Sequence, residues 1–213
     1  MKTQEDGRDT RWAEHRRQRR RELVESALRA IRRHGATVGM DEIASEAGTS
    51  KPVIYRHFGD RPGLYRAVVE KVAQFILDDL RTSVGWDDVK DLDQLIRDLT
   101  HSYLELVQRD PEIYRFVMSR PLVEGDLSDD PVTGLTMRIG ERIAELLQAN
   151  GIDAGRAASW GHGLVGCVRA ATDQWIRAGM NRPAADVADD LADLLGPATH
   201  PANRLVSTLE GHR

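Results

Sequence analysis

The sequence predicts an all-α protein, and three observations support this class. Apolar residues recur with the spacing of one helix face, as Val24, Ala27, Leu28 and Ile31 do. Proline and glycine separate the periodic segments, often next to an aspartate that can cap the following helix. The alternation of apolar and polar residues that is typical of strands is nowhere sustained.

Four elements are expected in the first third of the chain. Residues 1–15 carry few aliphatic side chains and many charges, so we expect a disordered basic arm. A first helix follows and stops near Gly35. Two short helices at about 40–47 and 51–58 and a longer one at about 61–80 come next. Gly48 is assigned to the turn between the two short helices. Ser50 and Asp60 are assigned as N-caps of the helices that follow them, and Pro52 lies in the first turn of its helix.

Further helices are expected after a loop at 82–90. Their ranges are about 91–109, 111–119, 131–149, 154–179 and 184–195. We therefore expect a first domain at 16–62, a second helical domain at 63–197 and a flexible tail at 198–213.

The charge is distributed unevenly along the chain. Residues 1–60 contain 13 Lys and Arg against 10 Asp and Glu, whereas residues 61–213 contain 17 against 24. A basic end on an acidic body favours a polyanionic partner at that end, although a solvated tail would give the same balance. The sequence shows no membrane span or secretory signal, and its single Cys167 excludes an intramolecular disulfide framework. These features predict a cytoplasmic protein.

Residues 40–64 carry the strongest functional pattern. Two short helices joined at Gly48 are typical of a helix-turn-helix. The second helix would lie in the DNA major groove, with its N-terminal residues near base edges. Ile54 and Phe58, four residues apart, would anchor it to the core. The residues predicted to face the groove are Thr49, Ser50, Lys51, Pro52, Val53 and Tyr55.

The same stretch resembles the DNA-binding signature of the TetR family of transcriptional regulators. The matching residues are Ile43-Ala44, Ala47-Gly48, Ser50, Ile54-Tyr55, His57-Phe58, Arg61 and Leu64. The resemblance implies that Tyr55, His57 and Arg61 hold phosphates. It also implies a homodimer whose C-terminal helical domain binds a small-molecule effector and provides the dimer interface. The alternative for Tyr55 and His57 is packing within a plain helical bundle.

Arg17 belongs to an arginine-rich stretch ahead of the helix-turn-helix, where phosphate contact and a solvated tail are both open. Segments 155–179 and 184–195 are assigned to the dimer interface, because they combine small residues with an apolar stripe. The alternative is that both stripes pack within one subunit.

A set of apolar and aromatic side chains in the second domain could wall an effector pocket, although each is also a plain core candidate. The set is Tyr103, Val107, Tyr114, Phe116, Ile139, Ile143, Trp160, Leu164, Val168 and Trp175. It predicts a lipophilic effector. The stretches 110–116 and 163–166 resemble actinobacterial members of the family that sense long-chain acyl thioesters.

No catalytic motif, metal-ligand spacing or cofactor-binding fingerprint is found, so no enzyme activity, metal or cofactor is expected. The expected function is a ligand-responsive, sequence-specific transcriptional regulator, a repressor released from operator DNA by its effector, with no membrane partner. The alternatives are an activator of the same fold, or a helical small-molecule-binding protein without operator specificity. Two rivals fit less well. A helical enzyme would need a cluster of titratable residues, which this sequence does not show, and an architectural DNA-binding protein would have a basic body, whereas residues 61–213 are net acidic.

Overall fold

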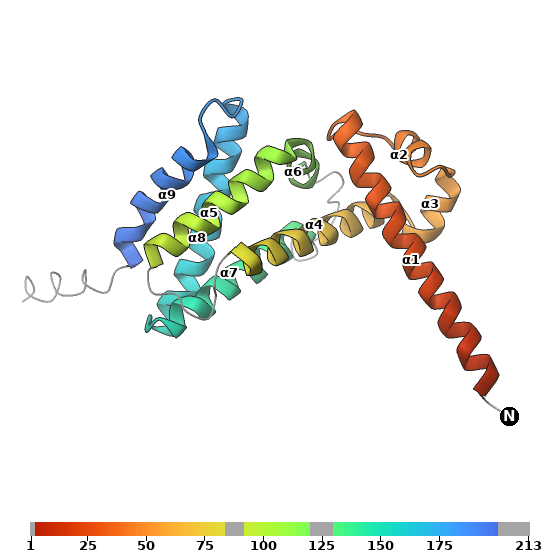
Figure 1. Cartoon of the computed structure of the whole chain (residues 1–213), viewed down its shortest axis with the longest axis horizontal. Helices are drawn as coiled ribbons and strands as arrows, with labels where there is room; N and C mark the ends of the chain where they lie inside the picture. The colour runs from red at the N-terminus through yellow and green to blue at the C-terminus, as the bar shows by residue number, and fades with distance from the viewer. Residues whose placement is uncertain (1–2, 84–91, 120–129, 200–213) are drawn as a thin grey trace, which may run out of the picture. The chain divides into compact units, whose positions relative to one another are not determined.

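The computed structural model describes residues 3–83, 92–119 and 130–199, and within these ranges every regular element is a helix (Figure 1). The helices are α1 (Thr3–His34), α2 (Met40–Glu46), α3 (Lys51–Phe58), α4 (Arg61–Ser83), α5 (Leu92–Arg109), α6 (Pro111–Met118), α7 (Pro131–Ala149), α8 (Ala154–Arg177) and α9 (Ala184–Thr199). The all-α prediction is confirmed. The loop expected at 82–90 overlaps the end of α4, and the tail expected at 198–213 overlaps the end of α9. Both otherwise lie outside the described residues.

The chain forms two compact units, which we describe separately. The first comprises the described parts of 1–72 and 112–132, and the second those of 73–111 and 133–213. In the first unit, the apolar face of α1 is buried, with Leu28 and Ile31 at most 1% exposed. Ile43 from α2, Ile54 from α3 and further side chains from α4 and α6 join the same core.

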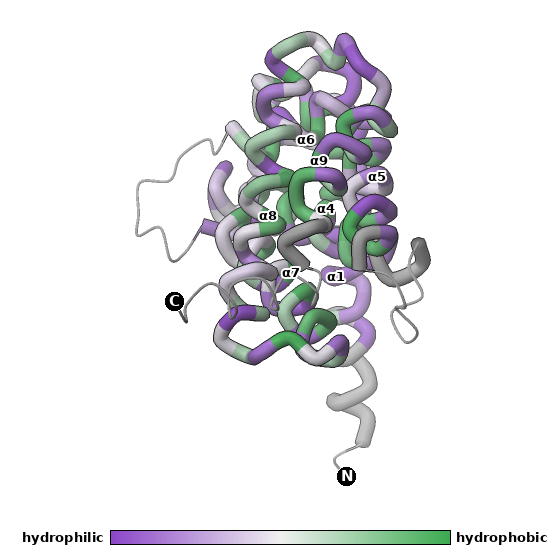
Figure 2. The backbone as a smooth tube through the Cα atoms, turned by 90° about the vertical axis from the view of Figure 1, so that its left-hand side faces the viewer, coloured by the Kyte–Doolittle hydropathy of each residue, from purple (hydrophilic) through white to green (hydrophobic). Residues whose placement is uncertain are grey.

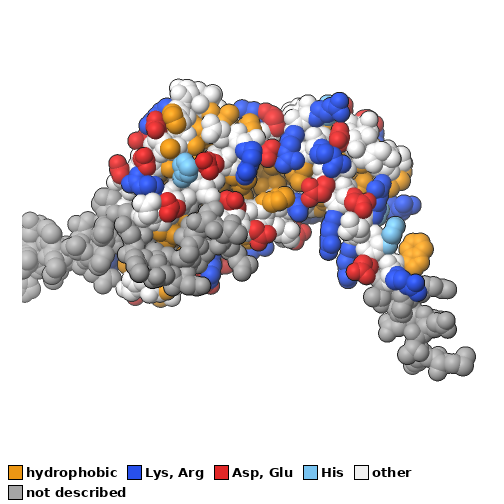
Figure 3. All heavy atoms as spheres, viewed as in Figure 1, with side chains coloured by type: hydrophobic (Ala, Val, Ile, Leu, Met, Phe, Trp, Pro, Cys, Tyr) orange, Lys and Arg blue, Asp and Glu red, His pale blue; other side chains and the backbone are white. Residues whose placement is uncertain are grey.

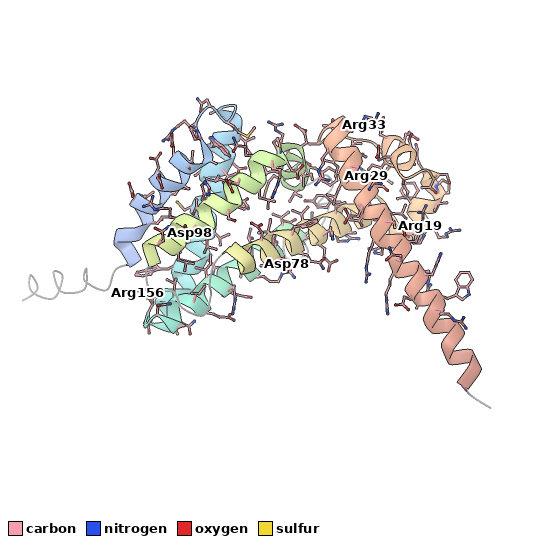
Figure 4. All side chains as sticks on the ribbon, viewed as in Figure 1. Arg19, Arg29, Arg33, Asp78, Asp98 and Arg156 are labelled. Atoms are coloured by element: carbon pink, nitrogen blue, oxygen red, sulfur yellow. The ribbon has the colours of Figure 1, made fainter. Side chains whose placement is uncertain are left out.

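α1 and α2 are also joined through one acidic side chain. Glu46, near the end of α2, accepts a hydrogen bond from Arg29 Nε at 3.2 Å and lies 3.6 Å from Arg33 Nη1. Figure 4 shows both arginines on the α1 ribbon at its α2 end. These contacts set the position of α2, which carries the first half of the helix-turn-helix.

The predicted disordered arm is wrong for residues 3–15, because α1 begins at Thr3. No proline interrupts this stretch, and arginine, glutamate, glutamine and alanine are strong helix formers. A helix already anchored by its buried C-terminal half adds further residues without a new nucleation cost. The small number of apolar residues predicts disorder, but the high helix propensity of this stretch outweighs it.

The first unit also extends beyond residue 62, the boundary expected from the sequence. The Tyr65 hydroxyl on α4 donates to the Val117 carbonyl on α6 at 2.7 Å. On the same helix α6, the Glu112 carboxylate accepts from the Ala36 backbone N–H at 2.9 Å. Two hydrogen bonds and shared core residues therefore attach α6 to the first unit.

The second unit is built from amphipathic helices, and Figure 2 shows hydrophobic and hydrophilic residues alternating along them. Arg97 on α5 pairs with Asp189 and Asp193 on α9, which joins these helices at their surface. α7 and α8 approach closely, because a Cβ added to Gly161 would lie only 2.4 Å from the Gly140 carbonyl oxygen.

Candidate nucleic-acid interface

The turn between α2 and α3 depends on Gly48, as the sequence predicts. Gly48 has φ +58, a backbone conformation that side-chain-bearing residues rarely adopt. Its N–H donates to the Ser45 carbonyl at 3.1 Å, and the Thr49 N–H donates to the Ala44 carbonyl at 3.0 Å. These bonds close the C-terminal end of α2 and direct the chain into α3 three residues later.

Helix α3 has one buried and one outward-facing side. Ile54 is 1% exposed and Phe58 is 8% exposed, so the predicted core anchors are confirmed. Pro52 and Tyr55 are exposed on the other side, and the Tyr55 ring is 39% exposed. A large aromatic residue at this exposure on a short helix is available to a partner.

The start of α3 leaves the Ser50 side chain available. Ser50 occupies the N-cap position with an extended backbone, but its hydroxyl makes no capping hydrogen bond. Thr49 and Val53 are half-buried and Ser50 is exposed. The cap position predicted for Ser50 is therefore confirmed, although the hydroxyl itself is not committed to the helix.

Lys51 is tied to α2 by an ion pair that the sequence analysis missed. Its Nζ lies 2.7 Å from Asp41 Oδ2. The hydrogen bond with Asp41 raises the pKa of Lys51 above its usual value. The cation is therefore paired at the surface and its charge is partly compensated, so a DNA group that approaches it competes with an exposed carboxylate.

His57 lies at the C-terminal end of α3 in a positively charged environment. Burial is the main cause that lowers the pKa of its imidazole, and the charges of Arg56, Arg19 and Arg20 lower it further. The free protein therefore holds a neutral imidazole at pH 7. A neutral imidazole can still donate one N–H to a phosphate oxygen.

Two further predicted phosphate ligands lie outside α3. Arg61 opens α4, is half-buried, and its Nη2 is 3.5 Å from the Val38 carbonyl oxygen. Arg17 is exposed on α1. Figure 3 shows Lys and Arg side chains gathered along the first unit, as the charge distribution of the sequence predicts. Asp60 accepts from the Gly63 N–H at 2.6 Å and so caps α4 as predicted.

The side chains predicted to wall an effector pocket do not form one cluster. Tyr114 and Phe116 belong to the first unit, where the ring of Phe116 lies 5.7 Å from that of Tyr65. Phe116 is 5% exposed within the core around α1. This packing fits the core alternative for Phe116 better than an effector contact.

The remaining members of this set lie in the second unit and fall into two apolar groups. Ile143, Trp160 and Leu164 pack in one, and Val168 and Trp175 in the other, while Val107 is buried and Tyr103 and Ile139 are half-buried. Trp175 also lines a hollow of about 340 Å³ between α8 and α9, together with Gln174, Arg182, Val187, Asp190 and Leu191.

Within the described ranges, no group of three or more His, Cys, Asp or Glu side chains is arranged to hold a metal ion. No helix in these ranges is both long and apolar enough to cross a bilayer.

A helix-turn-helix with an outward-facing second helix is the arrangement expected of a DNA-binding protein. The family described as "Bacterial regulatory proteins, tetR family" matches residues 23–68, and "Tetracyclin repressor-like, C-terminal domain" matches residues 79–206. The chain therefore belongs to the TetR family of bacterial regulators, and its function is regulation of transcription rather than catalysis. TetR-family regulators bind operator DNA, typically as homodimers that respond to small molecules.

Relatives and solved structures agree with this assignment. The chain is 35% identical over 192 residues to the uncharacterized HTH-type transcriptional regulator Rv0472c of Mycobacterium tuberculosis, across 89% of this chain and 79% of that protein. It is 29% identical over 128 residues to the transcriptional activator FasR of Mycolicibacterium smegmatis, across 60% and 58%. The regulator FadR of Bacillus subtilis, solved with stearoyl-CoA, shares the fold at TM-score 0.62 and 16% identity, across 84% and 98%.

Proposed function

We propose that this protein is a repressor that binds a palindromic operator as a homodimer and is released by a lipophilic acyl effector. The observation that carries the DNA-binding part is the two-sided α3. Ile54 and Phe58 fix one side in the core, and Tyr55 and Pro52 are exposed on the other. A helix held in this way presents a constant face to the major groove.

Two roles are divided among the predicted DNA-contact residues. The side chains at the start of α3, from Thr49 to Val53, are proposed to reach base edges. Tyr55, His57, Arg61 and Arg17 are proposed to contact phosphates, which supply affinity without sequence information. This division predicts that Pro52 or Val53 variants change operator preference, whereas an Arg17 variant weakens binding to every duplex.

The proposed dimer interface is the outer face of α8 together with α9. Gly163, Gly166 and Ala170 are exposed, and a Cβ on either glycine would meet nothing within 4 Å. Leu194 on α9 is 67% exposed. Small residues allow two helices to approach closely, and a twofold operator requires a twofold protein. Sedimentation equilibrium of a Gly166→Glu variant should give a monomer if this face is the interface, and a retained dimer would exclude it.

The acyl effector is proposed from two supports. The apolar side chains of Ile143, Trp160 and Leu164 pack in one group of the second unit. The FadR structure that shares this fold was solved with stearoyl-CoA, and other proteins of similar structure are described as fatty-acid regulators. The effector would act by favouring a conformer whose two α3 helices no longer match successive major grooves.

A second candidate, an activator, has one specific support, namely the similarity to the activator FasR. A reporter fused to the target promoter distinguishes the two. Deletion of the gene raises expression under a repressor and lowers it under an activator.

Footprinting of the purified protein on its own upstream DNA tests the proposal. A protected palindrome with two half-sites one helical turn or a multiple apart is expected. The double variant Tyr55→Phe with His57→Ala should lose this footprint, whereas Arg138→Ala, on the exposed surface of α7, should keep it. Protection that ignores sequence, or an unchanged footprint of the double variant, would exclude the proposed role of α3. Stearoyl-CoA should release the protein from this site. If no acyl-CoA released it, an acyl effector would be excluded.

A further inference from the structure

We propose that Arg20, in the arginine-rich part of α1, is a positioning residue that holds the C-terminal end of α3 and so sets the angle of the recognition helix. The arginine stretch was expected to serve phosphate contact or solubility. Arg20 is exposed, but its guanidinium contacts α3, the helix proposed to contact DNA. This inference rests on α3 as the recognition helix.

The first support is a hydrogen bond. Arg20 Nη1 donates to the backbone carbonyl of His57, 37 residues away along the chain. The last carbonyls of a helix have no intrahelical partner, and the chain leaves α3 at Gly59 with φ +82. Arg20 therefore satisfies a carbonyl that α3 itself leaves open.

The second support is stacking on an anchor residue of α3. The guanidinium carbon of Arg20 lies 4.3 Å from the centroid of the Phe58 ring, a distance that allows a cation–π contact. Phe58 is one of the two side chains that fix α3 in the core. One guanidinium thus contacts both the backbone and the anchoring side chain of the last turn.

The third support is charge. The C-terminal end of a helix carries partial negative charge, so a cation at this place is favourable. At the opposite end of α3, the ion pair of Lys51 with Asp41 joins the helix to α2. The recognition helix is therefore attached at its beginning to α2 and at its end to α1, on top of its apolar contacts.

The neighbouring arginines differ from Arg20 in this respect. Arg16, Arg17 and Arg21 are exposed, as Arg20 is, but they have no hydrogen-bond or ion-pair partner among the described residues. Arg19 pairs with Glu22 on the same helix. Arg21→Ala therefore removes the same charge from the next position without removing a contact to α3, and it is the matched control.

The test compares Arg20→Ala, Arg20→Lys and Arg21→Ala in the full-length protein. Three quantities are measured: amide hydrogen exchange at residues 54–58, the Kd for operator and random duplex across a salt series, and thermal stability. Arg20→Ala should speed exchange in α3 and weaken operator binding by roughly tenfold, the loss expected for one charged hydrogen bond. Random-duplex affinity and the salt slope should stay at the wild-type values.

Arg20→Lys keeps the charge but not the flat guanidinium, so it should recover the operator affinity only in part. Arg21→Ala should leave exchange in α3 at the wild-type rate. If Arg20→Ala weakens both duplexes equally and lowers the salt slope by about 0.9, Arg20 is a phosphate ligand and the proposal is wrong.

If Arg20→Ala only lowers the melting temperature, with α3 exchange and operator affinity unchanged, the proposal is also wrong. A wild-type protein that does not distinguish operator from random duplex would contradict the proposed function. The exchange comparison of Arg20→Ala with Arg21→Ala would still decide the role of Arg20.

Discussion

The close approach of α7 and α8 gives a stability prediction with a built-in control. A Cβ added to Gly161 would lie 2.4 Å from the Gly140 carbonyl oxygen and 2.9 Å from the Ala144 nitrogen. Both are backbone atoms, so neither can move without moving α7. Gly134, also within a helix, would place its Cβ more than 4 Å from any such atom. The change from Gly to Ala has the same intrinsic effect on helix propensity at both sites.

Gly134→Ala should therefore be the more stable of the two variants. Gly134→Ala should stabilise the protein by about 0.5–1 kcal/mol, because alanine loses less backbone entropy in a helix. Gly161→Ala gains the same increment but forces the helices apart, and overpacking of this kind costs about 1–3 kcal/mol. A chain of this size shifts its Tm by about 2–4 °C per kcal/mol.

Thermal unfolding followed by circular dichroism, with urea unfolding as a second measure, separates these outcomes. Gly161→Ala should melt below Gly134→Ala, with the wild type between them or close to Gly161→Ala. If Gly161→Ala melted as high as Gly134→Ala, the α7–α8 contact would be looser in solution, and the reasoning from backbone overlap would be refuted.

Four further predictions concern the first unit. Operator affinity should rise as pH falls from about 8 to 6, because His57 has a lowered pKa in the free protein and a phosphate favours its protonated form. Fluorescence anisotropy checks this, and a His57→Gln variant that kept the pH dependence would contradict it. Since the folded pKa of His57 lies below the unfolded one, stability should also decrease as pH falls below about 6.5. Asp41→Asn should tighten operator binding by roughly threefold, as it frees Lys51, and an unchanged Kd would argue against competition by the carboxylate. Tyr65→Phe should lower the free energy of unfolding by about 1 kcal/mol in urea titrations, because the Val117 carbonyl loses its donor. A Tyr65→Phe midpoint equal to that of the wild type would mean that water replaces this bond.

The elements and caps with local causes were predictable from the sequence. The turn at Gly48, the cap at Asp60 and the helix at 131–149 depend on residues within one or two turns of each other. The cap at Asp153 has the same local origin, since its side chain accepts from the Gly155 N–H at 3.1 Å. Short-range signals of this kind do not need the fold to be known.

The features that depend on contacts between distant segments were not predictable. The bond from Tyr65 to Val117 spans 52 residues, and it is one reason why α6 belongs to the first unit. The sequence marks Phe116 as a core or pocket candidate, but helical spacing does not say which side chains surround this residue. For the same reason, the predicted effector-pocket residues were apolar as expected yet divided among separate groups.

The separate roles of the arginines at 16–21 were also not predictable from the sequence. Five arginines between residues 16 and 21 look equivalent in the sequence, and a count of charges assigns all of them to DNA or to solvent. The structure separates them, because only a side chain at the position of Arg20 meets both an open carbonyl and the Phe58 ring. Affinity for phosphate scales with the number of cations that contact it, whereas sequence is read through base contacts, which α3 would make from the position that Arg20 holds. Substitutions in this stretch should therefore fall into two classes, one that changes the salt dependence of binding and one that changes the choice of sequence.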